Sequence, residues 1–289
     1  MARSPGFRVA LSAIFASCMA VVSPAAGFTL LGTKWDPGPN AASTFVNPPG
    51  TPGSATWSLM PSAVGLDVAL ANPQSPLFDP DHSGPSTSMD GLLGNLNSSV
   101  EEIAAINAAL SVWDAASGFT SLGMVLDGGA LAGGPTATMG HLGDIRTGAY
   151  PFIFGVLAGA FMPGTEVLFG AGGTVGGDVH MNNAVFWVDD STDVFSDPDV
   201  DFFTVMLHEL GHALGLGHSS DSSAVMNATY MGARRTLSAD DVQGIQAIYG
   251  PASTVPGPGT LALLFLGAAP LLLLRIRCSA FPRSSPAAM

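Results

Sequence analysis

Apolar side chains recur every three or four residues after Ser99, and this spacing predicts a helix with one buried face. Ser98 or Ser99 is placed to cap its first turn, and Gly118 follows its end. We interpret the apolar stripe as core packing. The repeating positions are Val100, Ile103, Ile106, Ala109, Leu110 and Trp113.

A second apolar pattern lies on a stretch that begins after an aspartate. Phe202, Val205 and Met206 recur at helical spacing, so they predict the buried back of another helix. Asp199 or Asp201 is in position to cap this helix, because an aspartate side chain accepts hydrogen bonds from the free N–H groups of a first turn.

The remaining periodic stretches predict a closing helix and several strands. The closing helix is expected to start at Ser238, which approximates a capping box with Asp241, and to stop at Gly250. Glycine-rich loops separate the strand-like stretches, so helices and strands mix along the chain. The predicted strands cover residues 55–60, 119–126 and 141–147.

Composition fits one sizeable domain with processing segments at its ends. The chain has 289 residues, of which 47% are apolar and 11% are charged. Between Gly27 and Gly259 four basic residues stand against 22 acidic ones, a net charge of −18. Such a body repels nucleic acid and anionic lipid, while its carboxylates suit either calcium binding or simple solubility. Cys18 and Cys278 lie outside this body, which therefore has no disulfide.

Residues 1–27 have the pattern of a secretory signal peptide. Arg3 and Arg8 precede an apolar run, and small residues follow that run near Ala26. We therefore expect an exported protein. Residues 28–54 then form an N-terminal extension ahead of the first predicted strand.

The C-terminal end is a second candidate targeting segment. A linker rich in proline and glycine at residues 251–260 leads into the segment 261–289, which is apolar up to Leu274 and then basic. This apolar run is short for a helix that spans a membrane, which needs about twenty residues.

The stretch from His208 to His218 carries the strongest chemical signal. His208 and His212 are four residues apart, so on a helix their imidazoles lie on one face and can bind a single metal ion. A continuing helix would carry His218 about 9 Å along the axis. Gly215 removes this difficulty, because glycine readily adopts the left-handed conformation that ends a helix. Three neutral imidazoles leave one position open for water, which is typical of a catalytic zinc.

Glu209 lies beside the first histidine without being placed to bind the same ion. A carboxylate there is suited to act as the general base that takes a proton from a zinc-bound water. A short His-Glu-x-x-His pattern also arises by chance on surface helices. The additional Gly215, His218 and Met226 make that alternative much weaker.

With these residues the stretch resembles the metzincins, and its flanks resemble the matrixin branch of that clan. Ser219, Met226 and Tyr230 have matrixin counterparts, as do the closing residues 237–250. The matrixin-like region covers about residues 55–250. The resemblance implies an α+β, zincin-like domain with a twisted mixed sheet, two long helices, an active-site helix and a C-terminal helix. It also implies that Met226 forms a Met-turn beneath the metal and that Tyr230 belongs to the substrate pocket.

The matrixin resemblance also concerns further metals. It implies a calcium site in which Asp144 and Asp178 supply carboxylate oxygens, with a plain glycine-rich loop as the alternative. Matrixins carry a second, structural zinc, but of its ligands only His180 is present here. Glycine stands at position 159, where the family has a histidine, so we expect one zinc rather than two.

The resemblance also predicts where substrate lies. The family binds substrate in extended form along a strand at the upper rim of the cleft, and the resemblance places this strand within residues 175–188. Matrixins usually have proline where Ala228 stands, so we expect a differently shaped wall of the main specificity pocket.

The tail resembles the PEP-CTERM sorting signal of Gram-negative bacteria, in which a Pro-x-Pro motif, a short apolar helix and a basic cluster direct processing at the inner membrane. Residues 255–260 supply the prolines, with Gly257 in place of the usual glutamate, and Arg275 and Arg277 supply the basic cluster. The resemblance implies a transient association with the inner membrane. An uncleaved membrane anchor is the alternative.

The sequence thus predicts a monomeric zinc endopeptidase that hydrolyses extracellular or surface proteins. His208, His212 and His218 would bind the zinc, and Glu209 would act as the general base. The competing hypothesis is an extracellular matrix or surface protein that keeps a metzincin scaffold without turnover. The intact ligands, Glu209 and Met226 favour the enzyme.

Overall fold

The computed structural model describes residues 10–13, 21–22, 27–39, 42–44, 50–65, 84–93, 99–129, 143–152, 155–164, 175–195 and 198–253. The chain divides into a compact unit of residues 1–252 and a second unit of residues 253–289, of which only Ser253 is described. The predicted sorting segment 261–289 and most of the predicted linker therefore lie outside the described residues.

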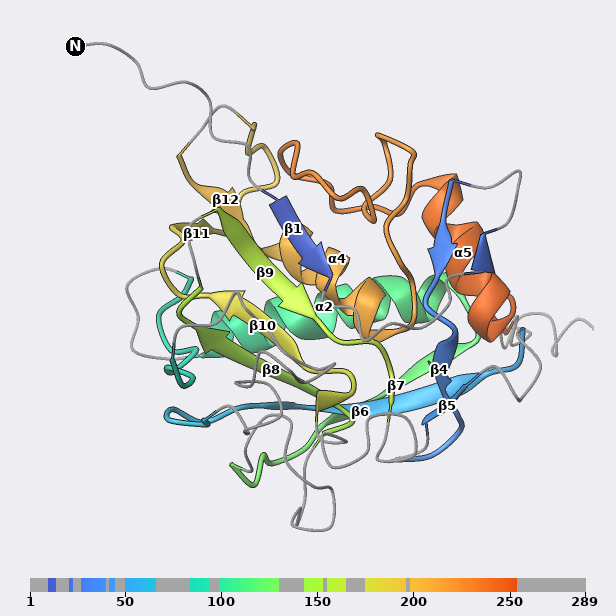
Figure 1. The fold of residues 1–289 in the computed structure, drawn as a ribbon, viewed down its shortest axis with the longest axis horizontal. Helices are drawn as coiled ribbons and strands as arrows, with labels where there is room; N and C mark the ends of the chain where they lie inside the picture. The colour runs from blue at the N-terminus through green and yellow to red at the C-terminus, as the bar shows by residue number, and fades with distance from the viewer. Residues whose placement is uncertain are drawn as a thin grey trace, which may run out of the picture. The chain divides into compact units, whose positions relative to one another are not determined.

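Three helices and twelve strands are assigned within the described residues (Figure 1). The helices are α2 (Val100–Ala116), α4 (Phe202–Ala213) and α5 (Ala239–Tyr249). The strands are β1 (Ala10–Ala13), β2 (Val21–Val22), β3 (Thr29–Leu30), β4 (Thr33–Trp35), β5 (Ala42–Thr44), β6 (Gly53–Leu59), β7 (Phe119–Met124), β8 (Ile145–Tyr150), β9 (Val156–Ala160), β10 (Val179–Asn182), β11 (Trp187–Val188) and β12 (Val200–Asp201).

Six of these strands form one mixed sheet in the order β1-β9-β10-β8-β6-β7. Strands β6, β7, β8 and β10 pair in parallel, while β9 runs antiparallel to β10. Helices α2 and α4 lie behind β8, β9 and β10 in the view of Figure 1 and pack against each other. The predicted α+β fold with a mixed sheet is confirmed.

The strand that was predicted to form the rim of the cleft is not at an edge. Within residues 175–188, β10 lies between β8 and β9 and is buried along its whole length. β9 takes the outer position in the predicted domain, and β1 pairs with it in parallel. The prediction was wrong because strand order depends on pairing between distant segments, which the composition of a single strand does not reveal.

Helix α2 follows the predicted apolar stripe with one exception. Trp113 is fully buried, and its indole N–H donates to the carbonyl of Leu207 on α4 at 3.0 Å. Val100, in contrast, is 65% exposed, because the helical spacing continues beyond the part of α2 that faces the core. Ser99 is the N-cap residue, but its side chain makes no capping hydrogen bond.

The other two helices begin where the sequence predicted. Asp201 caps α4, and its carboxylate accepts the backbone N–H of Thr204 at 3.0 Å. Ser238 and Asp241 form a complete capping box at the start of α5. The cap at Asp201 thus defines where α4 begins.

Residues 28–39 begin the predicted N-terminal extension. The described part of this extension packs into the domain. The indole N–H of Trp35 donates to the carbonyl of Ala213 at the end of α4, at 2.8 Å. The backbone N–H of Leu31 donates to the carbonyl of Gly215, also at 2.8 Å. The sequence placed these residues outside the fold because they show no helical or strand periodicity, whereas their contacts are made with a turn almost 180 residues later.

Candidate metal centre

Helix α4 and the turn after it bring three histidines together. The ring centroids of His208 and His212 are 4.7 Å apart, and those of His208 and His218 are 5.4 Å apart. Each of the three offers a ring nitrogen, and these nitrogens all lie within 4.8 Å of one another. Among the described residues, this is the one group of three or more histidine, cysteine or acidic side chains with such spacing.

Gly215 makes the return of the chain possible, as predicted. Its φ is +103°, in the left-handed region that favours glycine. A Cβ atom at this position would lie 2.3 Å from the carbonyl oxygen of Thr33, so the neighbouring N-terminal segment leaves no room for a side chain. The helix ends at Ala213, and His218 can approach the other two histidines from a new direction.

Backbone carbonyls orient two of the imidazoles. His208 Nδ1 lies 2.7 Å from the carbonyl oxygen of Val225, and His212 Nδ1 lies 2.7 Å from that of Leu216. A carbonyl only accepts, so each Nδ1 carries the hydrogen and each Nε2 keeps a free lone pair. The Nε2 atoms of all three histidines are buried and have no hydrogen-bond partner among the described residues.

Burial also keeps these histidines neutral. It lowers the pKa of His208 to about 3, with a smaller contribution from His218. It lowers the pKa of His212 well below its usual range and that of His218 in the same direction. Three neutral imidazoles with convergent lone pairs are a donor set that suits zinc and leaves a coordination position open, so the residues fit the expected metal.

Glu209 is fully buried next to this group. Neither oxygen of its carboxylate has a hydrogen-bond partner among the described residues, and burial raises its pKa well above the usual range. A buried carboxyl with a strongly perturbed pKa beside three histidines is a candidate for proton transfer.

Met226 packs under α4, as the predicted Met-turn requires. It is 1% exposed, and a Cβ atom on Gly211 would lie 2.3 Å from its sulfur, so the glycine allows this close contact. The carboxylate of Asp241 accepts the backbone N–H groups of Val225 at 2.8 Å and of Met226 at 3.1 Å. Asp241 therefore fixes the carbonyl that orients His208.

The neighbouring Asp240 ties down a different part of the chain. Its carboxylate accepts the backbone N–H groups of Gly27 at 2.8 Å and Phe28 at 3.1 Å, and the hydroxyl of Ser219 at 2.6 Å. No local pattern predicted these contacts of Asp240, or those of Asp241 with the Met-turn. The capping box of α5 was the only role that local spacing could reveal.

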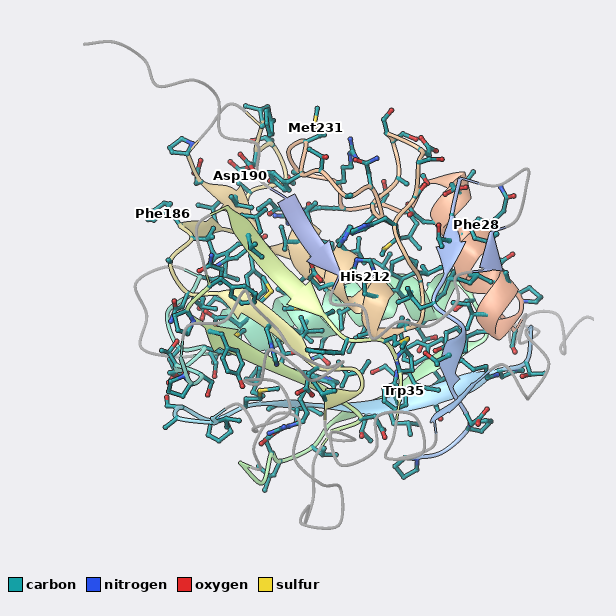
Figure 2. The ribbon with its side chains drawn as sticks, viewed as in Figure 1. Phe28, Trp35, Phe186, Asp190, His212 and Met231 are labelled. Atoms are coloured by element: carbon teal, nitrogen blue, oxygen red, sulfur yellow. The ribbon has the colours of Figure 1, made fainter. Side chains whose placement is uncertain are left out.

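A small pocket lies beside His208, between α4 and the segment after the Met-turn. Its lining includes Val205, Tyr230, Met231 and Arg234. Figure 2 places His212 near the centre of the view and Met231 above it, toward the outside of the molecule. Tyr230 belongs to this lining, and its role in a substrate pocket stays a prediction.

Tyr230 also has a structural contact that the sequence did not reveal. Its hydroxyl donates to the carboxylate of Asp193 in a short hydrogen bond and accepts the backbone N–H of Asp201 at 2.9 Å. The pocket wall is thereby joined to the N-cap of α4.

The residues predicted to bind calcium have other partners. The carboxylate of Asp144 accepts the backbone N–H and the hydroxyl of Thr56, both at 2.7 Å. Asp178 is fully buried, with Arg146 Nη1 at 3.9 Å and His180 Nε2 at 3.6 Å from its carboxylate. Burial raises the pKa of Asp178, and the Arg146 charge opposes this shift. The calcium site stays a prediction.

The glycine turn before the third histidine and the methionine turn beneath the ligands are the features that distinguish metzincins among zinc peptidases. Their presence on this mixed sheet defines a metzincin catalytic domain. Within that class, residues 146–250 match the matrixin family model.

Known relatives agree with this assignment. The chain is 39% identical to matrix metalloproteinase-20 of Homo sapiens over 170 residues, which cover 57% of this chain and 31% of the relative. It is 45% identical to matrilysin of Rattus norvegicus over 85 residues, 28% of this chain and 30% of the relative. It is 40% identical to interstitial collagenase of Oryctolagus cuniculus over 105 residues, 36% and 19% of the two chains. The matched stretches thus span less than a third of each relative.

Proposed function

We propose that the protein is a zinc-dependent endopeptidase that hydrolyses extracellular or surface proteins. One observation carries the proposal: three buried Nε2 atoms converge without a protein partner beside a buried carboxylate that also has none among the described residues. Leaving such atoms unsatisfied is costly, so their concentration at one place favours a metal and a reacting group as their partners.

The chain's own residues divide the work of the reaction. Zinc, when bound by His208, His212 and His218, supplies a Lewis acid that polarises a carbonyl and makes a water more acidic. The carboxylate of Glu209 accepts the proton from the attacking water and then delivers it to the leaving amine. The carbonyls of Val225 and Leu216 keep the imidazoles in the orientation that this arrangement needs.

Substrate is proposed to bind in extended form along β9. An open strand presents unpaired backbone groups to which a peptide can add as a further strand. Residues 10–13 pair with β9 in this way, which supports the view that this edge accepts an extended segment. The pocket beside His208 would then receive a side chain next to the scissile bond.

Cleavage of an unstructured protein such as casein tests the proposal. We expect hydrolysis that a zinc chelator abolishes and added zinc restores. A folded protein that holds zinc but leaves casein and a broad peptide library intact would instead favour the competing hypothesis of a surface protein on a metzincin scaffold.

We further propose that the protein is a monomer exported from a Gram-negative cell. The signal-like residues 1–27 and the sorting-like segment 261–289 support this proposal. Within the described residues, none of the helices has the length and apolar character needed to cross a bilayer. The proposed transient attachment at the inner membrane is assigned to the tail, on the resemblance of residues 255–277 to a sorting signal.

A further inference from the structure

Arg234 is the one side chain with a permanent charge among the residues that line the pocket beside His208. The lining contains no acidic residue. His208 offers its Nε2 to the proposed zinc. The remaining lining residues are apolar or uncharged. A substrate side chain in this pocket therefore lies beside the one permanently charged residue of its lining.

Two hydrogen bonds hold Arg234 in place beside the pocket. Its backbone N–H donates to the hydroxyl of Thr204 on α4 at 2.7 Å, and its Nη1 donates to the carbonyl of Ala224 at 2.8 Å. The guanidinium has five N–H groups, and the carbonyl of Ala224 is the one acceptor that the described residues give it. Donors therefore remain for a ligand, on a side chain whose position is already restricted.

Arg234 forms no ion pair with the described part of the chain, whereas its neighbour Arg235 does. Arg235 lies 2.6 Å from a carboxylate oxygen of Asp189 and forms a short contact with Asp201. Hydrogen bonds from Ser223 are the main cause of the lowered pKa of Asp221, and the charge of Arg234 contributes least. The carboxylate of Asp221 is itself engaged by the backbone N–H and hydroxyl of Ser223.

We propose that Arg234 makes this pocket select an acidic side chain, so that the protein cleaves next to an aspartate or a glutamate. The inference rests on the proposed endopeptidase function and names its substrate class. Charge-assisted hydrogen bonds from a guanidinium to a carboxylate are stronger than those to a neutral amide. The acidic body repels an acidic peptide as it approaches the protein. The preference for an acidic side chain therefore arises only at contact distance, inside the pocket.

A double-mutant cycle between enzyme and peptide isolates this charge contact. The peptides are identical except for glutamate or glutamine at one of the two positions that flank the scissile bond, with a compensating lysine far from it. The enzymes are the wild-type chain and Arg234→Gln. At 0.15 M salt, we expect the wild type to cleave the glutamate peptide with a kcat/KM about fivefold or more above that of the glutamine peptide, at one of the two positions. We expect this ratio to fall to about one in Arg234→Gln.

Arg235→Gln is the matched control, because it makes the same change of charge one residue away and outside the pocket lining. Its folded, zinc-loaded fraction should keep the wild-type ratio, and Arg234→Lys should keep most of it. A wild-type ratio near one, or a preference that survives in Arg234→Gln, would overturn the inference. If Arg234→Gln fails to fold, the wild-type and Arg234→Lys ratios still decide it. A wild type that cleaves no casein would refute the proposed function instead.

Discussion

Buried polar atoms without a partner are rare in folded proteins, because each costs about 1–3 kcal/mol. In the described part of the chain, the three Nε2 atoms and both oxygens of Glu209 are in this state within one small region. Their cost is recovered only when a ligand binds there. Metal binding and folding should therefore be strongly coupled in this protein.

The first prediction concerns the carboxylate of Glu209. Glu209→Ala should keep its zinc, because all three imidazoles remain, but turnover of casein should fall by about 10² to 10⁴ with the loss of the general base. Zinc content and hydrolysis rate are measured on the same preparation. Glu101→Ala removes a carboxylate from α2 instead and should change neither quantity. An active Glu209→Ala enzyme would be incompatible with the mechanism.

At the scale of elements, the turn after α4 requires glycine at position 215 on two grounds, its backbone conformation and the lack of space for a side chain. Gly215 and Gly38 share a φ of +103°, but a Cβ atom would meet the carbonyl of Thr33 at Gly215 and nothing within 4 Å at Gly38. Substitutions at the two positions thus separate the loss of stability caused by backbone conformation from the loss caused by a steric clash.

Gly38→Ala should therefore lose about 1–2 kcal/mol of unfolding free energy and keep normal zinc affinity. Gly215→Ala should lose more than this and bind zinc more weakly, because relief of the clash moves His218. Urea unfolding and competition with a chelator measure the two effects. Equal losses in both variants, with zinc affinity unchanged, would mean that the turn does not position the ligand.

The features that the sequence predicted are those encoded by neighbouring residues. The caps at Asp201 and Ser238, the break at Gly215 and the histidine spacing all act within a few positions, so they can be recognised from local patterns. The position of β9 between β1 and β10, the packing of Trp35 and the contacts of Asp241 with the Met-turn depend on contacts between distant segments. No local pattern specifies those contacts, which is why the rim strand was misplaced.

At the scale of the whole molecule, the metal content is predicted to be one zinc per chain. His180 is enclosed by Asp178, Tyr150 and Phe161, and the other ligands of the family's second zinc are missing from the sequence. Elemental analysis of the dialysed, active protein should give a ratio near one. Two tightly held zinc ions would contradict this prediction.

The calcium prediction is tested on the same material. Calcium that binds only the folded chain raises stability by about 2.7 kcal/mol at a hundredfold excess over Kd. A melting temperature that rises with millimolar calcium in the wild type, but not in Asp178→Ala, supports the ion. An unchanged melting temperature means that Arg146 is the cation that balances Asp178.

The last prediction concerns the tail. If residues 261–289 act as a sorting signal, the exported protein should first fractionate with the inner membrane and then lose its C-terminal residues. Membrane fractionation followed by intact-mass measurement detects both steps. A soluble exported form that still ends at Met289 would argue against sorting, and a full-length form that stays in the membrane would support the alternative of a permanent anchor.

The adjacent aspartates of α5 have a consequence for the order of events during synthesis. Asp240 holds the beginning of the folded chain, and Asp241 holds the Met-turn, yet both are made after all three histidines. A chain that ended before α5 would therefore contain all three metal ligands but lack the carboxylate that holds the Met-turn and, through it, the carbonyl that orients His208. Zinc captured at that stage would be held by side chains not yet fixed in place. A competent site then requires α5 as well as the metal.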